Sequence, residues 1–193
     1  MKKSLILAAI ALATVLSLTA SAAPLDGSIT IGAFGTFIDG TNLANSTLFA
    51  PIGLVVPGVF VGVTTGDYTA IPLATSGANG VIDLNNLSSY IVSFPGYGFF
   101  GATVGVILSQ TAEFLDAYFT GNFVPDPAGP LSGFDVSPSS VRVSLNQSGD
   151  SVSYGATLAS PPAPPQEIPE PASYAMLGAG LVGLALVRRR KAA

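Results

Sequence analysis

Residues 141–159 read VRVSLNQSGDSVSYGATLA, and this stretch decides the fold. In its first half, apolar and polar residues alternate, with Val141, Val143 and Leu145 on one face and Arg142, Ser144 and Asn146 on the other. After Ser148-Gly149 the alternation resumes with Val152, Tyr154, Ala156 and Leu158. A period of two on both sides of a glycine predicts two β-strands joined as a hairpin.

Three further stretches follow a similar pattern. In FLDAYFTGNF (114–123), one face carries Leu115, Ala117, Phe119, Gly121 and Phe123, and the other carries Asp116, Thr120 and Asn122. In SITIGAFGTFID (28–39), we expect one face to carry Ile29, Ile31, Ala33 and Phe37. FFGATVGVIL (99–108) is more continuously apolar and predicts a more buried strand.

One apolar run needs a separate interpretation. Residues 49–63, FAPIGLVVPGVFVGV, are apolar for long enough to suggest a helix, but Pro51 and Pro57 would break it. We interpret this run as a loop that leads into a buried strand. Short strands separated by Gly and Pro turns predict an all-β fold, an antiparallel β-sandwich or barrel-like module.

The charges are few and unevenly distributed. Only 9% of the 193 residues are charged, whereas about 25% is usual in a soluble domain. Residues 23–159 carry nine Asp or Glu and one base, Arg142, which gives a formal net charge of 1 − 9 = −8. Such a surface repels phosphate backbones, so the sequence excludes nucleic acid as a partner.

The N-terminus has the pattern of a secretory signal peptide. Lys2 and Lys3 precede an apolar stretch, and Ala20-Ser21-Ala22 supplies small residues at the two positions that signal peptidase reads. We therefore predict that residues 1–22 form a signal helix, that signal peptidase cleaves after Ala22, and that the protein is exported.

The C-terminus has a second apolar segment followed by bases. Residues 172–187 are uncharged, and as a helix they would reach ~24 Å across a hydrocarbon core of ~30 Å. The basic tail 188–191 would stay in the cytoplasm and place the preceding module outside. We predict a transmembrane helix over 172–187.

Pro169-Glu170-Pro171 stands just before that segment, and the two prolines keep the peptide around Glu170 extended and accessible. The order of tripeptide, apolar span and Arg188-Arg189-Arg190-Lys191 resembles the PEP-CTERM sorting signal of Gram-negative bacteria. The resemblance implies that Pro169, Glu170, Pro171, Arg188, Arg189 and Arg190 are the recognition residues of an exosortase, a membrane-embedded processing enzyme. It also implies a sorting route tied to exopolysaccharide and biofilm production.

These features divide the chain into four parts. We predict a signal peptide at 1–22, a β-rich extracytoplasmic module at 23–159, a Pro-rich linker at 160–168 and the PEP-CTERM signal at 169–193. Six prolines between Pro161 and Pro171 favour a polyproline-like segment of up to ~34 Å. Residues 114–159 are also similar to the β-rich modules that often precede this signal.

Catalytic motifs are scarce. The chain has no His and no Cys, and the module has no Lys, which excludes the usual nucleophile–base pairs and His-based zinc sites. Glu113 and Asp116 would point to opposite faces of a strand, so only a distant carboxylate pair remains for hydrolysis. We predict no enzymatic activity, no cofactor and no catalytic or metal-binding residue.

Two weaker candidates concern binding. Turns at 39–42 (DGTN) and 83–86 (DLNN) offer oxygen ligands for calcium, but Asp and Asn also favour turns for backbone reasons. Around a Pro-Gly turn, SYIVSFPGYGFF (89–100) gathers five aromatic residues, which either contact a carbohydrate or cap the core: Tyr90, Phe94, Tyr97, Phe99 and Phe100.

Three functions remain open at this stage. The leading hypothesis is an exported, non-catalytic surface or matrix protein that the C-terminal helix anchors transiently in the inner membrane. The second is a carbohydrate-binding adhesin or lectin-like module for the exopolysaccharide. The third is a carboxylate-based hydrolase.

Overall fold

The computed structural model describes residues 22–164. Within this range the protein is all-β, and its only helices are three short 3₁₀ turns: η1 (Leu43–Asn45), η2 (Asp67–Ala70) and η3 (Leu87–Ser89). No helix in this part of the chain has the length and apolar character needed to cross a membrane. The predicted signal helix and transmembrane helix lie outside the described residues.

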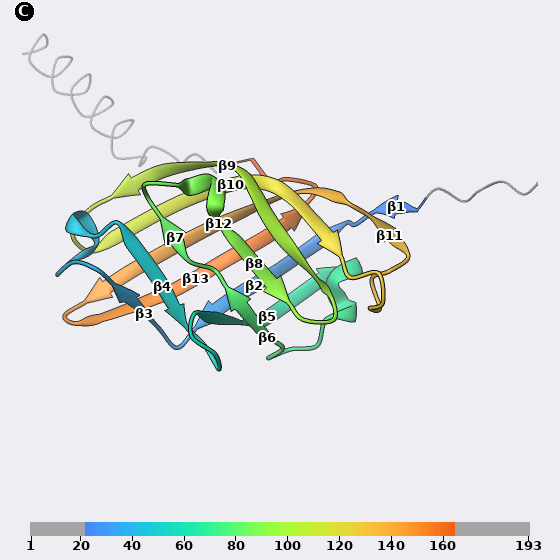
Figure 1. Ribbon diagram of the computed structural model, residues 1–193, viewed down its shortest axis with the longest axis horizontal. Helices are drawn as coiled ribbons and strands as arrows, with labels where there is room; N and C mark the ends of the chain where they lie inside the picture. The colour runs from blue at the N-terminus through green and yellow to red at the C-terminus, as the bar shows by residue number, and fades with distance from the viewer. Residues whose placement is uncertain (1–21, 165–193) are drawn as a thin grey trace, which may run out of the picture. The chain divides into compact units, whose positions relative to one another are not determined.

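Eight strands close into a barrel (Figure 1). Their order around the wall is β10-β12-β13-β2-β5-β6-β8-β9, and every pairing between neighbours is antiparallel. The bounds of these strands are β10 (Phe114–Pro125), β12 (Ser137–Ser148), β13 (Ser151–Ser160), β2 (Gly27–Ala33), β5 (Gly58–Gly66), β6 (Ser76–Asn79), β8 (Ile91–Phe94) and β9 (Gly98–Gln110). The prediction of an all-β, antiparallel module is confirmed, and the barrel is the alternative that the chain adopts.

Two small sheets complete the fold. β3 (Gly35–Ile38), β4 (Leu48–Ile52) and β7 (Ile82–Asp83) form a three-stranded sheet. β1 (Ala23–Pro24) pairs in parallel with β11 (Phe134–Asp135).

The predicted hairpin is confirmed. β12 and β13 pair from Ser140↔Ala159 to Ser148↔Ser151, and Gly149 in the two-residue turn has φ +58°. A left-handed φ at the first turn position suits the right-handed twist of the two strands, and glycine adopts it without strain.

The inner faces of the strands build one core. On β10, Leu115, Ala117, Phe119 and Phe123 are fully buried, as the alternation predicts. Tyr90 stacks on Phe119 with ring centroids 4.2 Å apart, and its hydroxyl hydrogen-bonds that of Tyr154 at 2.9 Å. Burial raises the pKa of both tyrosines, so each stays a neutral hydrogen-bonding group inside the core.

The prediction for β9 is wrong in part. Val104, Val106 and Leu108 are exposed on the outer face of the barrel. The register between β9 and β10 shifts between Thr120 and Gly121, so Thr103 is left over and the inward positions change from Phe100 and Ala102 to Gly105 and Ile107. A β-bulge of this kind reverses which residues face the core.

The prediction for residues 28–39 also fails at its end. Ile29 and Ile31 are buried, but Phe37 is 58% exposed. After β2 the chain leaves the barrel wall, Phe34 N donates to Ile52 O at 2.8 Å, and β3 pairs with β4 instead. The alternation therefore restarts on a different sheet.

Candidate functional site

Polar side chains gather on the outer face of β10, β12, β13 and β2. The strand register places Asp116 opposite Ser144, Ser144 opposite Gly155, and Gly155 opposite Gly32. In the next row, Tyr118 lies opposite Arg142, and Arg142 opposite Thr157. Positions with the same parity point to the same face of a sheet, so these residues share one outer surface.

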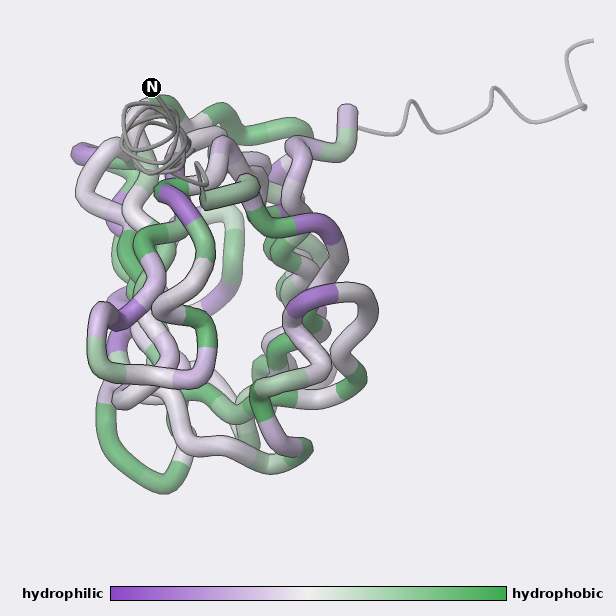
Figure 2. Tube along the Cα trace, turned by 90° about the vertical axis from the view of Figure 1, so that its right-hand side faces the viewer, coloured by the Kyte–Doolittle hydropathy of each residue, from purple (hydrophilic) through white to green (hydrophobic). Residues whose placement is uncertain are grey.

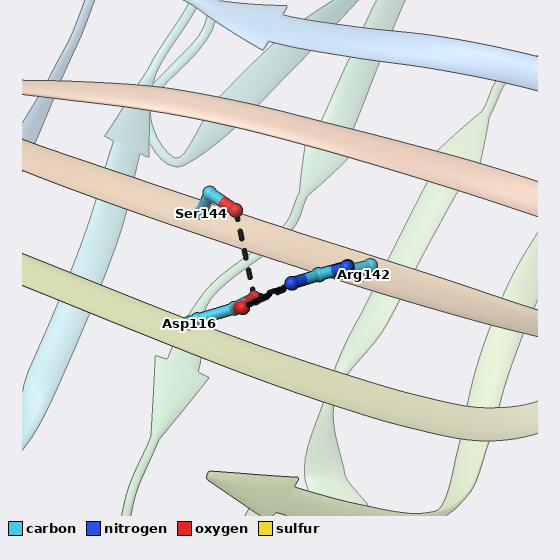
Figure 3. A network of polar contacts seen from close by, with 3 residues as sticks. All are labelled: Asp116, Arg142 and Ser144. Carbon is cyan, nitrogen blue, oxygen red and sulfur yellow. Dashed lines mark hydrogen bonds and ion pairs between the residues drawn. The ribbon is translucent and has the colours of Figure 1, made fainter. Parts of the chain in front are cut away.

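Asp116 and Arg142 form the one ion pair within residues 22–164 (Figure 3). Arg142 Nη2 donates to Asp116 Oδ2 at 2.6 Å, and Arg142 Nε lies 3.1 and 3.2 Å from the two carboxylate oxygens. Ser144 Oγ donates to Asp116 Oδ1 at 3.5 Å. The carboxylate is almost fully buried, whereas the Arg142 side chain is about one third exposed.

This pair is a structural clamp across two strands. Its hydrogen bonds are charge-assisted and forked, which fixes the position of both side chains. The hydrogen bond to Asp116 raises the pKa of Arg142, so the guanidinium keeps its charge. Because both oxygens of Asp116 are already engaged, we assign this carboxylate to the structure of the wall and not to acid–base chemistry.

A shallow groove of about 490 Å³ lies beside this clamp. Gly155 lines it, and a Cβ added there would meet no atom within 4 Å. Its rim carries hydroxyl, amide and guanidinium groups from Thr30, Arg142, Ser144, Asn146, Ser153 and Thr157. The groove therefore presents polar groups to a ligand, of which Thr30, Arg142 and Ser144 also hydrogen-bond within the protein.

An aromatic ring closes one side of this surface. Gly32 is the β2 neighbour of Gly155, and the Phe60 ring lies so close over Gly32 that a Cβ there would meet it at 2.9 Å. Phe34 packs on Phe60 with ring centroids 5.1 Å apart and is itself highly exposed. A polar groove beside an aromatic face is thus present on the described part of the chain.

The aromatic loop at residues 89–100 packs mainly against the core. Tyr90, Phe94 and Phe100 are fully buried, Tyr97 is partly buried against the core, and Phe99 is the one exposed member. The structure confirms the core-capping interpretation of this loop. The aromatic residues beside the polar groove, Phe34 and Phe60, were not predicted because only the fold brings them there.

The two acidic turns support backbone structure. Asp39 accepts hydrogen bonds from Thr47 N, Thr47 Oγ1 and Leu48 N at 2.8 to 3.0 Å, and these bonds lower its pKa. Asn42 caps η1, and Asp83 Oδ1 accepts from Asn85 N. Among residues 22–164, no group of three or more acidic side chains is placed to hold a metal ion.

The two ends of the described chain attach to the same part of the barrel wall. Leu25 N donates to Ser137 Oγ at 2.7 Å. Ala163 N donates to Ser140 Oγ at 3.0 Å, and Ala163 O accepts from Tyr118 Oη at 2.5 Å. Both ends of the described chain are therefore fixed near the start of β12.

A buried cluster of hydroxyl groups strengthens this region. Ser139 Oγ contacts Ser160 Oγ, which lies 2.6 Å from Tyr68 Oη. Desolvation raises the pKa of Tyr68 to about 12 and outweighs the opposing hydrogen bonds, so the phenol remains neutral. The sequence analysis missed this cluster because single serines and tyrosines carry no pattern of their own.

The predicted sorting and cleavage residues lie mostly outside the described chain. Ala20, Pro169, Glu170, Pro171, Arg188, Arg189 and Arg190 are not among residues 22–164. Ala22 is described, and β1 begins at the next residue. The first described strand, β1, thus follows directly on the predicted signal-peptidase site, and the barrel begins with β2 at Gly27.

Comparison with known proteins gives one match. A family model for the PEP-CTERM protein-sorting motif matches residues 167–191. No curated protein and no solved structure matches the chain. The suspected resemblance at the C-terminus is confirmed: the chain carries a PEP-CTERM protein-sorting motif, which indicates an extracellular protein sorted by an exosortase.

Proposed function

We propose that the protein is a non-catalytic component of the cell surface or extracellular matrix, delivered there as a stable barrel. Signal peptidase cleaves after Ala22, residues 172–187 anchor the chain transiently in the inner membrane, and an exosortase cuts near Pro169-Glu170-Pro171. The observation that carries this proposal is the sorting motif at residues 167–191, which follows the folded barrel module in the chain. Association with exopolysaccharide is part of the same proposal.

The attachment of Ala163 supports this order of events. Pro169 lies six positions after Ala163, and six residues span at most about 22 Å. Since Tyr118 and Ser140 hold Ala163 on the barrel wall, the free linker is shorter than the ~34 Å expected from all of its prolines. A cut near Pro169-Glu170-Pro171 would therefore fall only a few residues after the last described contact of the chain with the barrel.

The mass of the terminal peptides tests the proposal. We expect protein recovered from the cell surface or medium to start at Ala23 and to end between Ile168 and Pro171. Glu170→Ala should retain the C-terminal tail, whereas Glu167→Ala, three residues earlier, should still be processed. Recovery of a surface chain intact to Ala193 would overturn the sorting proposal and identify a permanent single-pass anchor.

A second candidate function is binding of a neutral polysaccharide in the groove around Gly155. Hydroxyl and amide groups beside the exposed ring of Phe34, which packs on Phe60, suit the polar edges and apolar faces of sugars. A ligand without negative charge fits a module of net charge −8 better than an acidic one.

A side chain that fills the groove distinguishes polysaccharide binding from the leading proposal of a surface or matrix component. A Cβ at Gly155 would meet no atom within 4 Å, and we expect Gly155→Val to fold and to be exported normally. If the groove binds the polysaccharide of the host, this variant should lose retention on that polysaccharide. Equal retention of both proteins would exclude the groove as the binding site.

A further inference from the structure

An apolar surface without charges covers part of the wall at β5. It consists of Phe34, Ile52, Leu54, Val55 and Val56, which we call the apolar cap. Phe34, Leu54 and Val56 are each about 70% exposed, and Val55 is 48% exposed. Side chains of this size are usually buried, so a group of five exposed together indicates a contact surface.

The five residues are contiguous. Phe34 N donates to Ile52 O at 2.8 Å, and the Phe34 ring packs on Phe60 of β5. Leu54, Val55 and Val56 follow in the loop between β4 and β5, in which Gly53 N donates to Val55 O at 3.2 Å. In Figure 1 this loop is the lowest part of the barrel, and in Figure 2 the hydrophobic colour runs along it.

The distribution of charge limits which class of molecule can bind the apolar cap. No Asp, Glu, Lys or Arg occurs between residues 40 and 66, although residues 23–159 carry a net charge of −8. The acidic remainder of the module repels anionic lipids, nucleic acids and acidic polymers. The residues of the apolar cap carry no charge, so contact between two caps brings no like charges together within the contact itself.

The apolar cap lies far from the point where Ala163 contacts the barrel wall. In the closed barrel β5 lies four strands from β10 in either direction, and β10 carries Tyr118, which holds Ala163. Along β2, Gly27 lies beside Gly66 and Ser160 near the two chain ends, whereas Phe34 follows the opposite end of the strand. The cap is therefore on the far side of the barrel from Tyr118 and Ala163.

We propose that the apolar cap binds the apolar cap of a second copy of this chain, across a two-fold axis. An isologous contact covers both caps at once and closes the assembly as a dimer. The cap exposes on the order of 500 Å² of apolar surface, less than the ~800 Å² per partner of a standard interface. The dimer is accordingly weak, and a high local concentration of copies on one surface favours its formation.

The absence of cysteine from the chain allows a clean test. Leu54→Cys, Val55→Cys and Val56→Cys each introduce a single thiol into the full-length protein in its host. A short, membrane-permeant bismaleimide should join two copies at one or more of these positions and give a band of twice the monomer mass. Because the reagent enters every compartment, the result does not depend on export.

Val106→Cys is the matched control. Val106 is 43% exposed on the outer face of β9, close to the 48% of Val55, but it lies outside the cap. It should remain monomeric under the same conditions. Adding Phe34→Ser to the best-linked cap variant should lower the dimer fraction at least about fivefold, since interface energy concentrates in large anchors.

Two results would overturn the proposal. One is monomer alone at all three cap positions while a test maleimide labels their thiols. The other is as much dimer from Val106→Cys as from the cap variants, which indicates random collision. Failure of sorting would show separately, as an unprocessed C-terminus in the same samples.

Discussion

The wall formed by β10, β12 and β13 differs from the segment between β2 and β5 in how completely it buries apolar side chains. β12 pairs with β10 over ten consecutive residues and with β13 over nine, without a register shift. Between β2 and β5 the chain leaves the wall, forms β3 and β4 in another sheet and returns. A long ladder enforces one face throughout, whereas each change of sheet exposes apolar residues such as Phe34 and Phe37.

The largest expected effect compares two phenylalanines. Phe119 of β10 is fully buried and stacked on Tyr90, so Phe119→Ala should cost about 3–5 kcal/mol of unfolding free energy. Phe37 of β3 is 58% exposed, and Phe37→Ala should change that free energy by less than about 0.5 kcal/mol. Urea denaturation of both variants measures the difference. Similar losses would show that β3 contributes to the core as much as the wall does.

The next effect concerns the clamp on the outer face of the wall. Arg142→Ala leaves the buried carboxylate of Asp116 with only the hydrogen bond from Ser144 on this face, and we expect a loss of about 2 kcal/mol. Removing both charges with Asp116→Ala in the same chain should restore part of that stability. Thermal unfolding of the two single variants and the double variant gives the coupling. An additive result would show that the two side chains do not stabilise each other.

A smaller effect tests the hairpin turn. Gly149 has φ +58°, and Gly149→Ala should cost about 1–2 kcal/mol because a Cβ is strained in that conformation. Gly155, in β13 of the same hairpin, has no positive φ and no neighbour that a Cβ would meet within 4 Å. Gly155→Ala should therefore leave the melting temperature unchanged or raise it slightly. Equal losses in both variants would contradict the assigned turn.

The same comparison explains what the sequence could predict. Alternation in 114–123 and 141–159 was sufficient for the wall, because long unbroken ladders keep one face inward. Alternation could not locate the bulge at Thr103, which turns Val104 and Val106 outward, since a bulge depends on the register with β10. The exit of the chain after Ala33 is likewise a property of the pairing of β3 with β4.

The functional features also fall into those that the sequence could predict and those that only the fold brings together. The signal peptide and the sorting motif could be predicted from the sequence because their charged residues, apolar segment and tripeptide follow one another along the chain. The clamp of Asp116 with Arg142, the attachment of Ala163 and the groove at Gly155 join residues more than twenty positions apart. Each residue was visible in the sequence, but its partner follows only from strand register.

The smallest effect concerns pH and the connection between β3 and β4. Hydrogen bonds from Leu48 N, Thr47 Oγ1 and Thr47 N lower the pKa of Asp39 below its usual 3.8. A folded pKa below the unfolded one contributes stability above pH 3.8, and this contribution is lost as the pH falls through the folded pKa. Asp39→Asn should therefore be less stable than the unaltered protein at pH 7, and the difference should vanish in strong acid. Urea denaturation at several pH values measures it, and a pH-independent difference would mean that the amide acts through geometry alone.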